Sequence, residues 1–268
     1  SQPHIDHQPA QRHKHRCARV VLGKKEEVER KVGGFSDFTD TLIEQSTRHV
    51  GRAIWREMKK GAQKPFEPGR AGTETIQAFL NAFASSSALP KKIHIVGHST
   101  GAILLASLLD ALDRTSATLR IETCLLMAPA CSHDVFNGVY RRLLKERDRA
   151  RFGINRMKIY NLNDRLERDD TVTPLYRKSL LYLVSNAFEE KRGEHILGMQ
   201  VFRRFLRKLP GPQIFKIELS DGSTTGSPRT SSRTHGGFDN DVNTMNDIVH
   251  YILRGTPRRE FTPEDLEY

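Results

Sequence analysis

Ser99 lies at the centre of the segment Gly97-His98-Ser99-Thr100-Gly101, which has a glycine at each end. A serine hydroxyl is a weak nucleophile until a base removes its proton, and a carboxylate commonly orients that base. If Ser99 does chemistry, the chain must therefore bring a histidine and an acid to it from other segments.

The residues on either side of Ser99 predict a strand followed by a helix. Ile93, Ile95 and Val96 form a short apolar run between Pro90 and a glycine, which is typical of a buried strand. Residues 102–112 then carry apolar side chains at helical spacing. A serine on so tight a turn between strand and helix is a nucleophile elbow, and the flanking glycines are expected to avoid steric collision.

His235 is the best histidine for the role of the base. It follows the last predicted strand, precedes the last predicted helix and has two glycines after it. His98 is adjacent to Ser99, but neighbouring side chains on a tight turn diverge, so we expect it to point elsewhere. His195 lies in a polar connection and His250 in a helix, and each is interpreted as structural.

Three carboxylates could serve as the acid, all in the acidic segment that follows a predicted strand over residues 157–162. Asp164 comes two residues after that strand. Asp170 lies in the segment DDTVTP and is the preferred interpretation, while Glu167 is a third possibility. Each aspartate could instead only cap a turn.

The remaining pattern alternates buried strands with helices, which predicts a mostly parallel sheet with helices on both faces. Further strands are expected at residues 121–127 and 213–219, with a short one at 19–22. Helices are expected at residues 37–60, 73–84, 135–151, 175–188, 201–209 and 242–253. Ligands of such sheets bind at the carboxyl ends of the strands, and Ser99, the acidic segment and His235 all follow a strand.

Composition narrows the function class. The formal net charge is +11, from 43 basic and 32 acidic residues, which favours contact with anions. The basic residues are scattered and no nucleic-acid-binding motif is present, which argues against a nucleic-acid partner.

No apolar run is long enough to cross a membrane, and the amino terminus has no apolar signal core. Cys17, Cys124 and Cys131 are an odd number without metal-ligand spacing. Cys124 lies in an apolar run, so a buried thiol is expected there rather than a disulfide, and a cytoplasmic location is expected for the protein.

The expected organisation is a polar tail, one domain and a second polar tail. Residues 1–18 are low in apolar residues, which favours a disordered tail; their four histidines are the basis of the alternative, a metal-binding tail. Residues 19–254 are expected to form the domain, and residues 255–268 to form the carboxyl-terminal tail.

Three segments together resemble the α/β-hydrolase superfamily: IHIVGHSTG, DDTVTP and THGGFDND, in the chain order Ser, Asp, His that this family uses. The resemblance covers residues 90–254. It implies that Ser99 attacks the carbonyl of a small-molecule acyl substrate, that His235 relays the proton and that Asp170 holds His235. It also implies that the Thr100 amide is one oxyanion donor, and it implies no cofactor and no metal.

The amino-terminal part departs from the family. Several strands normally precede the elbow strand, and the loop after one of them supplies a second oxyanion donor. Residues 1–90 offer only the short strand at 19–22, and the only upstream Gly-Gly is Gly33-Gly34. The family's amino-terminal strands are therefore missing from this chain or unrecognised. The sequence favours a serine hydrolase acting on a carboxylic ester, and the alternative is a catalytically inactive hydrolase-like binding module.

Overall fold

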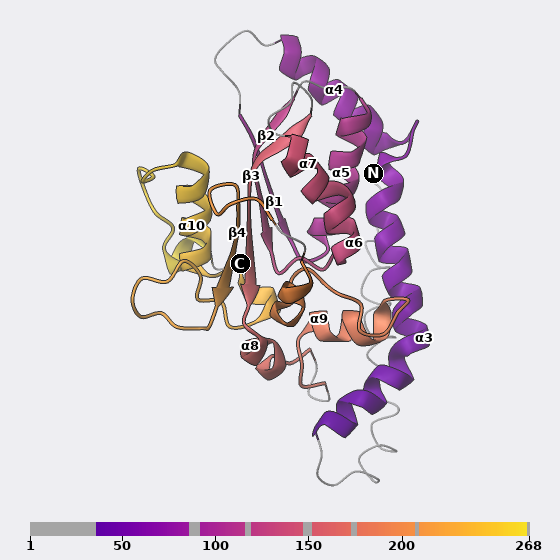
Figure 1. Ribbon diagram of the computed structural model, residues 1–268. Coiled ribbons are helices and arrows are strands. Elements are labelled where there is room, and N and C mark those ends of the chain that lie inside the picture. The colour runs from indigo at the N-terminus through magenta and orange to yellow at the C-terminus, as the bar shows by residue number, and fades with distance from the viewer. Residues whose placement is uncertain are drawn as a thin grey trace, which may run out of the picture.

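A four-stranded, fully parallel sheet forms the centre of the molecule in the computed structural model (Figure 1). The structure describes residues 36–85, 92–115, 119–146, 152–172, 176–206 and 209–266. The strand order follows the chain: β1 (Ile93–His98), β2 (Arg120–Met127), β3 (Gly153–Leu162) and β4 (Phe215–Ser220). The predicted parallel α/β class is confirmed. The predictions for the tail at residues 1–18 and the strand at 19–22 lie outside the described residues.

Burial of the strands decreases from the centre of the sheet to β1. Cys124, Leu125 and Leu126 on β2 are completely buried, as expected of a parallel strand that is covered on both faces. β1 is largely half-exposed, and Val96 is exposed. Within the described ranges no strand pairs with the other side of β1, so the elbow strand is an edge strand.

Helices cover both faces of the sheet (Figure 1). Helix α5 (Gly101–Arg114) and helix α7 (Arg141–Lys145) lie on one face, and helix α10 (Val242–Leu253) lies on the other. Each strand is followed by helical structure before the next strand, as crossover connections between parallel strands require. The turns between these helices and strands therefore gather at the two ends of the sheet.

Helix α3 (Ser36–Gln63) runs along the outside of this helical layer and is followed by helix α4 (Ala71–Ser85). Trp55 is buried, and its indole N–H donates to Glu189 Oε1 over 2.7 Å. The apolar residues Val50, Ile54 and Met58, spaced four apart, are exposed instead. Their spacing correctly indicates a helix, but the face that packs is the one that carries Trp55.

Two predicted helices are interrupted. Residues 135–151 were expected to form one helix, but the structure has helix α6 (His133–Val135), a π-helical turn (Phe136–Tyr140) and then α7. Gly138, a poor helix former, lies inside this turn. The turn lets Phe136 and Tyr140 both be buried, and the Tyr140 hydroxyl donates to the Ala102 carbonyl over 2.5 Å.

The predicted helix at residues 175–188 is shorter in the structure. Helix α9 (Leu180–Leu183) continues into a π-helical turn (Val184–Phe188) that packs against α3. The predicted helix at 201–209 is a 3₁₀ turn (Gln200–Phe205). In both places tertiary packing of the apolar side chains overrides the simple helical period.

The acidic segment after β3 is not a plain loop. It contains helix α8 (Asp164–Asp169), which begins where the Asn163 side chain accepts a hydrogen bond from the Leu166 N–H over 2.9 Å. Asparagine at this position satisfies one of the donors that a helix leaves unpaired. The short helix determines which way each carboxylate of the segment points.

Residues 255–266, expected as a polar tail, fold back on α10. The Asn246 side chain bonds both the N–H and the carbonyl of Phe261, at 2.7 Å and 3.0 Å. Thr262 and Asp265 form a capping box on a final 3₁₀ turn (Pro263–Asp265). None of the helices in the described ranges combines the length and apolar character that crossing a membrane would require.

Candidate active site

Ser99 lies on a strained turn between β1 and α5. Its φ angle is +53°, a left-handed conformation that costs a residue with a side chain about 1–2 kcal/mol. The neighbouring strand holds the turn in place: the Ser99 N–H donates to the Met127 carbonyl over 2.9 Å, and the Ser99 carbonyl accepts from the Ala130 N–H over 3.0 Å. Strain that is fixed in this way is characteristic of functional sites.

The two glycines around Ser99 have different roles. A Cβ on Gly97 would lie 2.7 Å from Leu105 Cδ1 and 3.2 Å from the carbonyl carbon of Gly101, so a side chain there has no room. A Cβ on Gly101 would meet no atom within 4 Å. The expectation that both glycines avoid a collision is therefore correct for Gly97 and wrong for Gly101.

The His235 ring reaches Ser99 from the other end of the chain. His235 Nε2 lies 2.9 Å from Ser99 Oγ, which is hydrogen-bonding distance. His235 is buried, and burial, together with the nearby His98, lowers its pKa from 6.5 to about 4. The ring is therefore neutral at pH 7 and can accept the proton of the serine hydroxyl.

The loop that carries His235 is attached to both β4 and α10. The Ser220 hydroxyl at the end of β4 donates to the Ser232 carbonyl over 2.6 Å. Asp241, which caps α10, accepts from the Ser231 N–H over 2.8 Å and from the Thr244 N–H over 3.1 Å. These bonds fix the polar loop between the strand and the helix and so bring its histidine to the carboxyl end of β1.

His98 holds the same loop from the other side. Its Nε2 lies 2.8 Å from the carbonyl oxygen of His235, and its Nδ1 lies 3.6 Å from an Asp239 oxygen. The predicted divergence of His98 from Ser99 is confirmed. The structure adds a role that the sequence did not suggest, because His98 supports the backbone of His235.

Asp170 is the acidic residue that contacts the histidine, but not through the ring. One carboxylate oxygen accepts the backbone N–H of His235 over 2.8 Å, and the other accepts the Thr171 N–H over 2.8 Å. His235 Nδ1 is buried and has no hydrogen-bond partner in the described part of the chain. The bond that the resemblance implies, from Asp170 to the ring of His235, is not formed here.

The other two candidate acids are engaged elsewhere. Asp164 accepts hydrogen bonds from the Tyr182 hydroxyl over 2.6 Å and from Arg168 over 2.9 Å. Glu167 is buried and accepts a hydrogen bond from the Ser179 hydroxyl, and burial raises its pKa to about 8. Both residues stabilise the α8 region and neither contacts His235.

Thr100 precedes the first turn of α5, whose amino terminus points its positive dipole end at this site. The first amide donors of the helix are paired inside the turn: Ala102 N–H donates to Ser99 and Ile103 N–H donates to Thr100. No acceptor for the Thr100 N–H is found among the residues that the structure covers. This amide is thus available as the predicted oxyanion donor.

Neither the cysteines nor any group of metal-ligating side chains in the described residues forms a second candidate active site. Cys124 and Cys131 are buried free thiols, as expected for Cys124. Across the described ranges no group of three or more His, Cys, Asp or Glu side chains could hold a metal ion. Neither the pocket beside α10 nor the pocket between α5 and the segment after α3 is lined by Ser99 or His235. Comparison with known proteins found no match, whether among family models, curated proteins or solved structures.

Proposed function

We propose that this chain is a serine hydrolase that cleaves a carboxylic ester or a related acyl bond through Ser99 and His235. The observation that carries the proposal is the 2.9 Å contact between Ser99 Oγ and His235 Nε2 on a turn with a strained, positive φ. Strain and a paired base at a single serine are expected of an activated nucleophile. The resemblance of three motifs to the α/β-hydrolase superfamily supports the same function.

The reaction would proceed in two halves. Ser99 Oγ attacks the carbonyl carbon while its proton passes to His235 Nε2, and the negative oxygen that develops accepts a hydrogen bond from the Thr100 N–H. The bond to the leaving alcohol then breaks, and the alcohol takes the proton from His235. Water next attacks the acyl-enzyme with His235 again as the base, which releases the carboxylic acid and restores Ser99.

Asp170 would act as a positioning residue in this mechanism. Its carboxylate holds the His235 backbone rather than the ring, so it orients the histidine without directly stabilising its cationic form. The pKa of His235, lowered to about 4 by burial, agrees with a base that lacks a carboxylate partner. The proposed centre is therefore a Ser–His dyad in which Asp170 holds the main chain of the histidine.

The alternative function is a non-catalytic, hydrolase-like binding module. It is favoured by the unpartnered Nδ1 of His235 and by the position of β1 at the edge of the described sheet. In a complete hydrolase a carboxylate would pair with the ring and further strands would flank the elbow strand. A domain without turnover would tolerate both features.

A fluorophosphonate probe separates the two functions because it labels only an activated serine. The folded wild-type chain should be labelled, and Ser99→Ala should abolish labelling. Ser107→Ala is the matched control, since that serine lies on α5 and donates to the Ile103 carbonyl. A folded chain that is never labelled, or equal labelling of Ser99→Ala, would overturn the hydrolase and favour the binding module. A panel of esters with different acyl lengths would then define the substrate.

A further inference from the structure

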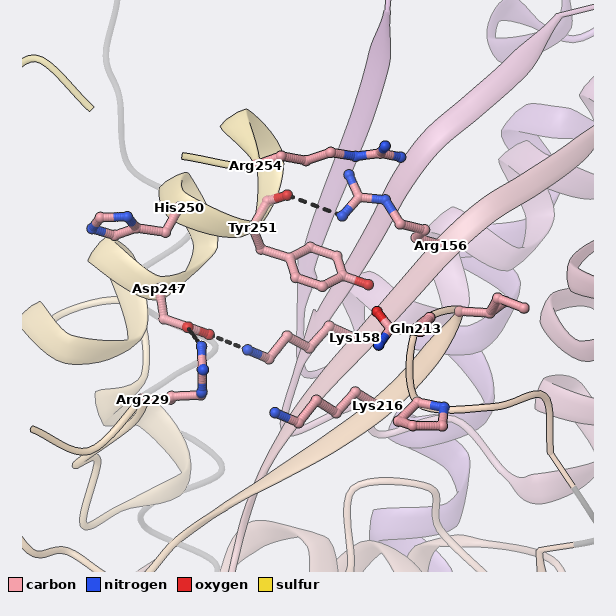
Figure 2. Close-up of a pocket in the computed structure, with 11 residues that line it drawn as sticks. Arg156, Lys158, Gln213, Lys216, Arg229, Asp247, His250, Tyr251 and Arg254 are labelled. Carbon is pink, nitrogen blue, oxygen red and sulfur yellow. Dashed lines mark hydrogen bonds and ion pairs between the residues drawn. The ribbon is translucent and has the colours of Figure 1, made fainter. Parts of the chain in front are cut away.

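A recess with a strongly basic lining lies on the face of the sheet that α10 covers. The pocket has a volume of about 720 Å³ and is lined by residues of β3, the segment before β4, β4, the loop after β4, and α10 with its C-cap (Figure 2). This volume is within the range of about 300–1,000 Å³ that is typical of small-molecule sites. It is far larger than one ion requires.

The lining carries more positive than negative charge. Five cationic side chains belong to it: Arg156, Lys158, Lys216, Arg229 and Arg254. Three carboxylates form ion pairs with them, namely Glu122, Glu218 and Asp247. The excess of two positive charges equals the charge of a phosphate dianion.

The buried side chains of the cluster are held in place by ion pairs and hydrogen bonds. Lys158 is buried, with 1% of its side chain exposed, and it pairs with Asp247 and lies 3.0 Å from Glu218. Asp247 also accepts the Tyr160 hydroxyl over 2.7 Å. The carboxylates are therefore held beneath the surface by a buried lysine, which orients the site before any ligand arrives.

The exposed part of the cluster is cationic. The side chains of Arg229 and Arg254 are 59% and 61% exposed and that of Lys216 is 38% exposed. The carboxylates are much less accessible: 8% for Asp247 and 16% for Glu218. A solute that enters the recess therefore meets lysine and arginine donors first.

Figure 2 shows how these side chains converge. Lys158 and Lys216 extend in parallel from neighbouring strands, with their amines toward Arg229 and Asp247. Arg156 lies over the Tyr251 ring, 4.6 Å from its centre, and donates to the Tyr251 carbonyl over 3.3 Å. The Tyr251 ring thus packs against the guanidinium of Arg156 within the lining of the recess.

We propose that this recess binds the phosphate group of a small organic molecule, at a site separate from Ser99. Planar guanidinium groups and a lysine ammonium are the side chains that best recognise phosphate oxygens. Lys216 in the recess lies at the amino-terminal end of β4, whereas Ser99 follows the carboxyl end of β1 in the same parallel sheet. Neither Ser99 nor His235 lines the recess, so the two sites are separate.

The test titrates inorganic pyrophosphate into the full chain and measures binding by calorimetry at fixed salt. The variant Lys216→Gln with Arg229→Gln should raise the dissociation constant by about tenfold or more. It should fold, because Lys158 still pairs with Glu218 and Asp247. The matched control is Arg56→Gln with Arg70→Gln, which removes the same charge from exposed positions outside the recess.

The control pair should leave pyrophosphate affinity within about twofold of wild type, because general attraction to a basic protein is screened by salt. Equal losses in both double variants, or no binding by the wild type at millimolar pyrophosphate, would overturn the proposal.

Sedimentation with phosphatidylcholine vesicles that contain phosphatidylinositol 4-phosphate identifies the source of the phosphate. Loss of vesicle binding only in the recess variant indicates a lipid headgroup, and pyrophosphate binding without vesicle binding indicates a soluble ligand. Fluorophosphonate labelling of Ser99 should be unchanged in the recess variant, so either proposal can fail without the other.

Discussion

The carboxylate of Asp170 accepts the backbone N–H of His235 over 2.8 Å, while Nδ1 of the same histidine is buried without a partner in the described part of the chain. The aspartate therefore fixes the position of the histidine through the main chain. This arrangement differs from a conventional triad, in which the carboxylate bonds the ring. The difference has measurable consequences.

Substitution of Asp170 separates the two arrangements. Asp170→Asn should label with fluorophosphonate within about tenfold of the wild-type rate, because an asparagine oxygen can still accept the backbone N–H. Asp170→Ala leaves this buried donor unpaired, which costs about 1–3 kcal/mol and should slow labelling by about ten- to a hundredfold. Asp164→Asn is the control, since Asp164 bonds Tyr182 and Arg168 instead.

A loss of about 10⁴ in the Asp170→Asn variant would contradict main-chain positioning, because that is the typical penalty when a triad aspartate can no longer hold the ring tautomer. Circular dichroism of each variant should show an unchanged fold, so that a change in labelling reports on the site.

The pH dependence of labelling reports on His235. Its pKa is lowered to about 4, so the ring stays neutral from pH 8 down to about pH 5 and becomes protonated only near pH 4. A protonated ring cannot accept the Ser99 proton, so the labelling rate should be flat over this range and should fall by half near pH 4. A midpoint between pH 6 and 7, the range of an unperturbed histidine, would contradict the lowered pKa of His235.

The two glycines of the turn should respond differently to alanine. Gly97→Ala puts a methyl group against Leu105 and the Gly101 backbone, and overpacking of this kind typically costs about 1–3 kcal/mol. Gly101→Ala has free space and lies at the start of α5, so its free energy of unfolding should be unchanged or slightly higher. Urea denaturation of both variants measures the contrast, and equal destabilisation would contradict the packing around Gly97.

Glu167 should make the protein less stable as the pH rises. Its pKa is raised from 4.5 to about 8, so between these values the native state keeps a proton that the unfolded state has lost. The free energy of unfolding should then fall by up to about 1.4 kcal/mol per pH unit across this window and level off above pH 8. Glu167→Gln cannot titrate and should remove this slope.

Urea denaturation at pH 5, 6.5 and 8 checks the prediction, with Glu74→Gln on the exposed side of α4 as the control. The control should follow the wild-type curve. Wild type and Glu167→Gln changing in parallel would show that Glu167 is ionised in the folded protein at neutral pH.

Local sequence was sufficient for the turn around Ser99 and for the class of the fold. Apolar runs bounded by glycine or proline predict β1, β2 and β4, although only β2 of these three strands is largely buried. Helix α10 begins and ends at the residues that its period predicts. The pairing of Ser99 with His235 agrees with the chain order, since each follows a strand and strand ends meet at one edge of the sheet.

Only the tertiary structure decided which atoms meet. Asp164, Glu167 and Asp170 are similar in sequence context. Helix α8 directs Asp164 toward Tyr182 and Glu167 into the interior, and its extended C-cap directs Asp170 toward His235. The phosphate recess has no local signature at all, because Lys158, Lys216 and Asp247 come from two strands and a helix that are far apart in the chain. The hydrophobic period of a sequence predicts which face of a helix or strand is buried. Hydrogen bonds instead depend on distances of a few ångströms between segments that only the folded chain brings together.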